Sequence, residues 1–207
     1  MKFLGIRSWR IGVSGDGYLA TFALWLRAVE AIEVPPSPLV PGPYDPGTSV
    51  LPPATGQPHD PGLGQEWLTW WLSMVDRGMK PPEPGTADVW PDGDTPDPVG
   101  FAGLSALRGY ASRRFLEFCR WRTDHQRADG TLMHRRQNPD QRTGDVVRAV
   151  EAALGRRAKP FDLQFTLLPV RDDRILRIAP THYLVPERVF LGDGWSEWLR
   201  PVVERVA

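Results

Sequence analysis

The sequence predicts an α+β fold in which a small antiparallel sheet packs against three to five helices. Apolar and polar residues alternate strictly over 161–167, which is typical of a half-buried strand. Earlier in the chain, apolar residues recur at helical spacing instead. The chain has 207 residues, which is enough for one sizeable core and short for two. We therefore expect a single domain over 1–207.

The N-terminal part is predicted to form a strand followed by a helix. Residues 3–13 contain an apolar alternation that ends at Val13, and a Gly-Asp-Gly turn follows. Apolar residues then fall on one helical face over 18–33. Pro35 and Pro36 end this helix, because proline has no N–H to donate to the helix ladder.

Two stretches are rich in proline, 35–61 and 81–98. The first, called the proline-rich segment below, contains ten prolines and few large apolar side chains. Such a chain is either a disordered linker or an extended strand of chain laid over a surface. Because it cannot build a core of its own, we expect it to be mobile in the isolated protein. We also expect deletion of residues 38–58 to leave the fold nearly intact while weakening the binding of a partner.

Three further helices are predicted from apolar stripes over 62–78, 104–126 and 144–154. In the last third, we expect the strand at 161–167 to turn back at Arg171-Asp172-Asp173-Arg174 into a return strand at 175–178. The remaining predicted elements are an extension of that strand over 181–185, a turn of helix near 186–191 and an amphipathic helix from Trp195 to the end.

Composition favours a soluble cytoplasmic protein. The net charge is zero, Cys119 is the only cysteine, and no apolar run is long enough for a signal peptide or a membrane span. An internal disulfide and a cysteine-based zinc cluster are therefore excluded. The charges are nevertheless segregated: residues 30–100 carry two basic and eleven acidic groups, whereas residues 101–159 carry thirteen basic and six acidic groups.

Candidate catalytic residues are few. His125 and His134 lie near Asp124 and Asp129, a set that is able in principle to bind a metal and activate water. However, their spacing matches no familiar metal motif, and the surrounding arginines oppose a cation. His182 is expected to be a structural, hydrogen-bonded histidine. We therefore predict no metal and no cofactor, and a hydrolase or nuclease using His125 and His134 is kept as an alternative.

The leading prediction is a non-enzymatic interaction or assembly protein that binds a protein partner, or a second copy of itself, through aromatic and proline-rich surfaces. Tryptophan is concentrated in cores and interfaces, and this chain has nine. The stripe formed by Trp67, Trp70 and Trp71 is expected to be mainly core, with at least one of Trp70 and Trp71 at its edge, because neighbours on a helix point 100° apart. The candidate partner-binding residues are Trp67, Trp70, Trp71, Tyr44, Arg113, Arg120 and Trp121.

A nucleic-acid binder is the other alternative. The arginine-rich region 113–142 is able to contact phosphates, and Trp121 is able to stack on a base. The acidic residues within this region and the neutral total charge weaken that interpretation. Residues Arg113, Glu117, Arg120 and Asp124 are expected to form a solvated helix face with alternating charge.

Overall fold

The computed structural model describes residues 9–14, 18–56, 60–79, 101, 103–128 and 139–207. The fold is α+β, as predicted, and within these ranges it has six helices and one four-stranded sheet. None of the described helices is both long and apolar enough to span a membrane. In chain order the elements are β1 (Trp9–Ser14), α1 (Tyr18–Val29), α2 (Leu63–Asp76), α3 (Ser105–Ala128), α5 (Pro139–Leu154), β2 (Phe161–Leu168), β3 (Leu176–Ala179), β4 (His182–Pro186), α6 (Glu187–Leu191) and α7 (Trp195–Val206).

The sheet is mixed, with the strand order β1-β2-β4-β3. β1 pairs in parallel with β2, and β2 pairs in parallel with β4, whereas β3 and β4 are antiparallel. The prediction of a purely antiparallel sheet is therefore wrong. The predicted hairpin at 171–174 is also wrong, because β2 does not pair with the strand that follows it; the tight turn lies at Pro180 and Thr181, between β3 and β4.

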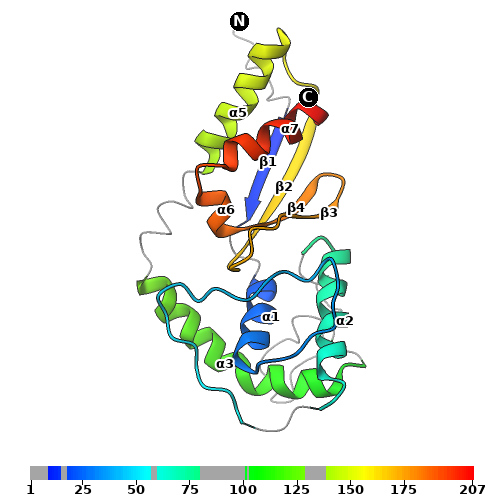
Figure 1. Cartoon of the computed structure of the whole chain (residues 1–207), viewed down its shortest axis with the longest axis vertical. Coiled ribbons are helices and arrows are strands. Elements are labelled where there is room, and N and C mark those ends of the chain that lie inside the picture. The colour runs from blue at the N-terminus through cyan, green and yellow to red at the C-terminus, as the bar shows by residue number, and fades with distance from the viewer. Residues whose placement is uncertain (1–8, 15–17, 57–59, 80–100, 102, 129–138) are drawn as a thin grey trace, which may run out of the picture.

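The elements separate into two parts, and Figure 1 shows the sheet with α5, α6 and α7 above the helices α1, α2 and α3. We call the first part the sheet half and the second, with residues 30–56, the helical half. Alternate residues of β1, β2 and β4 share one buried cluster with α5, α6 and α7, so these helices cover one face of the sheet. Its aromatic centre is Phe165, whose ring lies 5.1 Å edge-on from the indole of Trp195.

The helical half is built around the predicted tryptophan stripe. Trp67, Trp70 and Trp71 are each 0% exposed, so the core interpretation of the stripe is confirmed. The expectation that Trp70 or Trp71 reaches the edge is wrong, because α2 is covered on more than one side. The rings of Trp67 and Trp71 stack at 5.5 Å, and Trp70 lies 4.9 Å from Phe101.

The proline-rich segment covers one side of α2. Figure 1 shows the chain after α1 wrapping around the helical half. Its carbonyl groups accept hydrogen bonds from buried side chains, as when Trp71 Nε1 donates to Leu39 O at 2.8 Å. Tyr44 is buried and forms an isolated antiparallel bridge with Val170. The segment is therefore an extended chain laid over the helical core, and these contacts argue against the expected mobility. Proline cannot donate hydrogen bonds, but a proline-rich chain still offers acceptors and apolar rings.

A buried ion pair also holds the proline-rich segment in place. Glu30 is 0% exposed, and its Oε1 lies 2.5 Å from Arg114 Nε on α3. Thr55 Oγ1 donates to Glu30 Oε2 at 2.7 Å, and Arg114 Nη2 donates to Pro53 O at 2.8 Å. Burial by itself raises the pKa of Glu30, but the hydrogen bonds from Thr55 and Arg114 and the charge of Arg114 together hold it below its usual value.

The second proline-rich stretch, 81–98, lies outside the described residues. The single-domain prediction stays a prediction, although four residues of the sheet half belong to the same buried cluster as α1, α2 and α3. These residues are Leu168, Val170, Leu176 and Leu184.

Candidate functional site

Four of the predicted partner-binding residues are in the core. Trp67, Trp70, Trp71 and Tyr44 are buried, so in this structure no partner can contact their rings. Trp67 Nε1 donates to Ala23 O at 2.8 Å, which shows that this indole joins α2 to α1. The role of these four rings as a contact surface is thus not supported, because helix packing and the proline-rich segment cover them. The other three predicted residues lie on α3.

The outer face of α3 exposes a leucine between two arginines. The buried face of this helix includes Leu107, Ala111 and Phe118, and a helix turns 100° per residue. Leu116 therefore points away from the core together with Arg113 and Arg120, which lie three residues before it and four residues after it. Leu116 is 58% exposed, which makes it one of three exposed large hydrophobic residues in the described part of the chain, with Val50 and Leu154.

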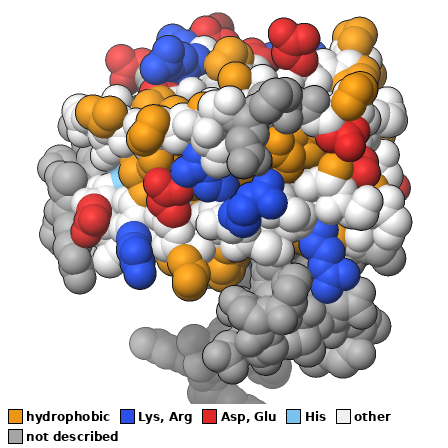
Figure 2. Space-filling view, turned by 90° about the horizontal axis from the view of Figure 1, so that it is seen from below, with side chains coloured by type: hydrophobic (Ala, Val, Ile, Leu, Met, Phe, Trp, Pro, Cys, Tyr) orange, Lys and Arg blue, Asp and Glu red, His pale blue; other side chains and the backbone are white. Residues whose placement is uncertain are grey.

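The positive charges of the two arginines on this face are not neutralised by an acidic side chain of the described residues. The guanidinium of Arg113 lies 4.8 Å from the ring centre of Tyr110, and neither Arg113 nor Arg120 forms an ion pair within the described ranges. Glu117, which was expected to balance them, instead forms an ion pair with Arg114. Figure 2 views the molecule from the helical end and shows basic side chains beside exposed hydrophobic ones. We call Arg113, Leu116 and Arg120 the α3 face.

A shallow hollow of about 370 Å³ adjoins the α3 face. It is lined by Cys119, Arg120, Thr123 and Asp124. Cys119 is half-buried, and its Sγ lies 3.0 Å from the hydroxyl oxygen of Tyr18. Burial and the contact with Cys119 raise the pKa of Tyr18. The lining of the hollow therefore combines the sulfur of Cys119 and the hydroxyl of Thr123 with the opposite charges of Arg120 and Asp124.

Trp121 lies at the flank of α3, next to the proline-rich segment. Its Nε1 donates to Val50 O at 2.9 Å, and its ring stacks on His125 at 4.9 Å. Val50 itself is 87% exposed. His125 Nδ1 lies 2.6 Å from Ser49 Oγ, so this imidazole is already engaged by two neighbours.

The predicted grouping of His125 with His134 and Asp129 is not tested, because His134 and Asp129 lie outside the described residues. Among the residues that are described, no three histidine, cysteine or acidic side chains come close enough to hold a metal ion. His182 is half-buried, and its Nε2 lies 2.9 Å from Thr166 Oγ1. That contact agrees with the structural role expected for His182.

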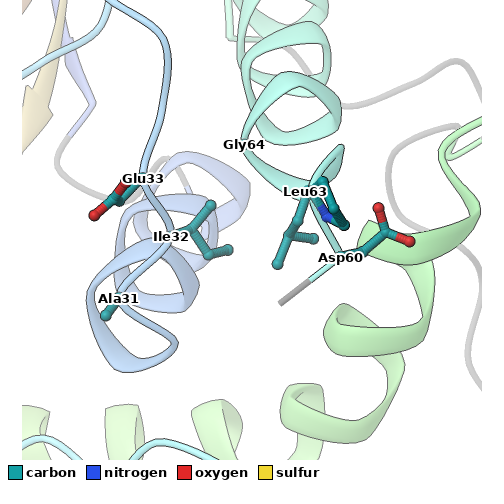
Figure 3. A pocket seen from close by; sticks show the side chains of 7 residues that line it. Ala31, Ile32, Glu33, Asp60, Leu63 and Gly64 are labelled. Carbon is teal, nitrogen blue, oxygen red and sulfur yellow. The ribbon is translucent and has the colours of Figure 1, made fainter. Parts of the chain in front are cut away.

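A second hollow, of about 280 Å³, lies where the end of α1 meets the start of α2. Figure 3 shows Ile32 and Leu63 facing each other at this point, with the carboxylates of Glu33 and Asp60 turned away to opposite sides. Asp60 Oδ1 accepts a hydrogen bond from the Gly62 amide. Gly64 is required here, since a Cβ at this position would lie 1.9 Å from Glu33 O. This hollow therefore follows from close packing of the two helix ends.

Comparisons with models of known protein families, with curated proteins and with solved structures found no match to this chain. Sequence reasoning missed Leu116, although a signal was present. Its position on the side of α3 opposite the apolar stripe follows from helical periodicity alone. Arg113, Arg120 and Trp121 were the predicted partner-binding residues that lie at or near this surface.

Proposed function

We propose that this protein is a non-enzymatic interaction protein and that the α3 face binds a protein partner. The observation that carries the proposal is the exposed side chain of Leu116 between two arginines that have no carboxylate partner in the described ranges. A large apolar side chain flanked by arginine is a common arrangement in protein interfaces, where arginine and apolar anchors are enriched.

The chemistry of the α3 face selects the kind of partner. Arginine binds carboxylates through two parallel hydrogen bonds, so Arg113 and Arg120 favour aspartate or glutamate on the partner. Leu116 favours an apolar side chain between those acids. The proposed partner is therefore an acidic protein segment that carries at least one large apolar residue. The hollow lined by Cys119, Arg120, Thr123 and Asp124 adjoins this face and offers room for one partner side chain.

Protein is a better fit than nucleic acid. Proteins that bind single strands stack bases on exposed aromatic rings. Trp121, the residue predicted to stack on a base, stacks instead on His125 and donates its N–H to Val50 O. Leu116 has neither a charge nor a hydrogen-bond donor with which to bind the phosphate groups of a nucleic acid. The hydrolase alternative gains no support from the described residues, in which His125 is engaged by Ser49 and Trp121.

The proposal is tested by comparing two charge-and-polarity variants of the full chain. The first combines Arg113→Glu, Leu116→Asp and Arg120→Glu. The control combines Leu154→Asp and Arg157→Glu, which change an exposed leucine and an exposed arginine near the end of α5. Partners are captured from the native cell with the wild-type chain and purified, and the Kd of each variant for the purified partner is then measured by titration.

We expect the control to bind like the wild type and the α3-face variant to bind at least about 30-fold more weakly, which corresponds to the loss of one interface hot spot. Equal binding by both variants would contradict the proposal. A captured nucleic acid whose affinity falls steeply with salt and vanishes in the α3-face variant would also contradict it, and would favour the alternative.

A further inference from the structure

The outward side of α3 follows from helical geometry. Figure 1 shows α3 at the end of the helical half farthest from the sheet. Successive residues of a helix point about 100° apart, so Gly109 and Thr123 point within about 20° of Leu116. Leu107 and Phe118 point about 160° to 180° away from Leu116 and are buried. The line from Gly109 through Leu116 to Thr123 is therefore the centre of the side that faces away from the core.

The two edges of this line differ in chemistry. Arg113 and Arg120 lie about 60° and 40° from Leu116 on one edge, whereas Ser112 and Cys119 lie about 40° and 60° from it on the other. Both arginines are exposed, and Ser112 and Cys119 are half-buried. Within about 60° of Leu116, charge is thus confined to one edge of the helix.

Space for a second helix exists on both sides of Leu116 along α3. Packed helices have their axes about 8 to 10 Å apart, and this distance depends on the side chains at the contact. A Cβ placed on Gly109 would meet Arg113 Nη1 at 3.5 Å, which is an ordinary contact distance. Toward the other end of α3 lies the hollow lined in part by Cys119 and Thr123. Leu116 is therefore a projecting side chain between two places where a partner's side chain fits.

The hydroxyl groups of this surface are already hydrogen-bonded within α3. Ser112 Oγ donates to Arg108 O at 2.8 Å, and Thr123 Oγ1 donates to Cys119 O at 2.9 Å. Covering a polar group is costly when the group is left without a hydrogen bond. A partner helix is therefore able to cover these residues without leaving either donor unsatisfied.

A helix fits this surface better than an extended chain does. Arg113 and Arg120 are seven residues apart, or about 10.5 Å along α3, and residues seven apart on a partner helix repeat that distance. Residues on one face of a strand are about 6.8 or 13.6 Å apart, which matches less well. An extended chain also brings backbone N–H and C=O groups that need partners, whereas those of α3 are bonded within the helix.

We propose that the partner binds the α3 face with an amphipathic α-helix that packs lengthwise along α3. This inference rests on the function proposed for that face. Acidic residues seven positions apart along one edge of the partner helix pair with Arg113 and Arg120. Apolar residues beside them pack around Leu116, and one side chain enters the hollow beside Cys119.

A second copy of α3 does not supply these acids. If two copies packed antiparallel around Leu116, Arg113 of one copy would lie beside Arg120 of the other, and like charges placed together oppose binding. If they packed in parallel, each arginine would face the edge formed by Ser112 and Cys119, neither of which is acidic. The charge pattern therefore selects a different protein over self-association through α3.

Three synthetic peptides of about 21 residues test the helical mode of binding, because this length exceeds the distance from Gly109 to Thr123. The helix peptide has leucine every seven residues and glutamate four residues after each leucine, on a background of alanine and glutamine. The rearranged peptide has the same composition, but its glutamates lie on the side opposite the leucines. The proline peptide keeps the first pattern and replaces two central alanines with proline, which prevents helix formation.

The Kd of each labelled peptide for the full-length protein is measured by fluorescence anisotropy at one ionic strength. We expect the helix peptide to bind at least about 10-fold more tightly than the other two, because it alone places acids and leucines together on a helical face. Circular dichroism should show that this peptide gains helix when it binds.

Two variants of the full chain locate the bound peptide. Gly109→Trp places a large ring where the partner helix is proposed to lie and leaves Arg113, Leu116 and Arg120 unchanged. Ala153→Trp is the matched control, since Ala153 is a small exposed residue on α5. We expect Gly109→Trp to weaken binding of the helix peptide by at least about 10-fold, and the control to bind like the wild type.

Equal Kd values for the helix and proline peptides would overturn the helical mode of binding, as would equal values for the helix and rearranged peptides or no saturable binding of any peptide. An equal loss of binding in Gly109→Trp and Ala153→Trp would overturn the location. If Gly109→Trp does not fold, the three wild-type Kd values decide. Failure of the proposed function is seen separately, in the titration of the purified natural partner with the triple α3-face variant, which uses no peptide.

Discussion

The helical half and the sheet half close their hydrophobic cores by different means. In the sheet half, regular elements suffice: α5 and α7 cover one face, and the rings of Phe165, Trp195 and Tyr183 fill the space between them. In the helical half, three helices leave α2 partly uncovered, and the proline-rich segment completes the enclosure. The core of the sheet half is thus enclosed by regular helices and strands, whereas the core of the helical half also needs an irregular segment to cover it.

This difference has a consequence for function. A segment that fills a structural role cannot also serve as a free binding element, so the surface that we propose for a partner lies elsewhere in the helical half, on the outer face of α3.

The largest effect that separates the halves is expected from deleting residues 38–55 and joining the ends with a short glycine-serine linker. This deletion removes the acceptors of Trp71 and Arg27 and one partner of Arg114. We expect near-ultraviolet circular dichroism to show loss of the fixed aromatic environment and calorimetry to show no cooperative transition for the helical half. A variant that keeps the wild-type melting temperature would show that the segment is dispensable.

A smaller effect, about 3 to 5 kcal/mol, is expected for Trp67→Ala in denaturant unfolding, since it leaves a large cavity and removes the hydrogen bond from Trp67 Nε1 to Ala23 O. Trp195→Ala is the matched change in the sheet half, where the indole is equally buried. We expect a similar loss there. A loss below about 1 kcal/mol for Trp67→Ala would mean that α2 is not covered as described.

The ion pair between Glu30 and Arg114 should make the helical half sensitive to acid. The pKa of Glu30 is lowered by folding, so its contribution to stability is present above its unfolded value, near 4.5, and is lost as pH falls through the lower folded value. Glu30→Gln should cost roughly 1 to 3 kcal/mol at pH 7 and reduce this acid dependence. Identical slopes of stability against pH in wild type and variant, measured below about pH 4.5, would argue against the ion pair.

The smallest effect on stability is expected for the α3 face. Leu116→Ser should change the free energy of unfolding by no more than about 0.5 kcal/mol, because the side chain lies largely in solvent. Chemical denaturation measures this directly. A clear loss of stability would indicate that Leu116 packs against another part of the chain and is not a free contact for a partner.

The helices could be predicted from the sequence, because their apolar stripes are local signals. The predicted helix at 62–78 is found at Leu63–Asp76, and the strand at 161–167 is found at Phe161–Leu168. The parallel pairing of β1 with β2 has no such signal, since all the helices of the helical half separate them. The turn at 171–174 was predicted from its residue types, yet Arg171 N donates to Pro43 O, so those residues serve a contact with the proline-rich segment.

The candidate site residues also divide into those that a local sequence pattern predicts and those whose position depends on residues far away in the chain. Arg113 and Arg120 were placed correctly on an exposed helix face by periodicity. Tyr44 was placed on a surface because its surroundings are rich in proline and poor in apolar residues, but its burial depends on Val170, far away in the sequence.

Hydrogen exchange of the wild-type protein tests most directly the claim that the proline-rich segment closes the helical core. The amide of Asp45 donates to Pro169 O at 2.8 Å, and that of Arg171 donates to Pro43 O at 2.9 Å. We predict that both amides exchange many times more slowly than in an unstructured peptide of the same sequence, in the isolated protein and without any partner. Exchange at the unstructured rate in residues 38–55, with normal protection in α1 and α2, would contradict the account.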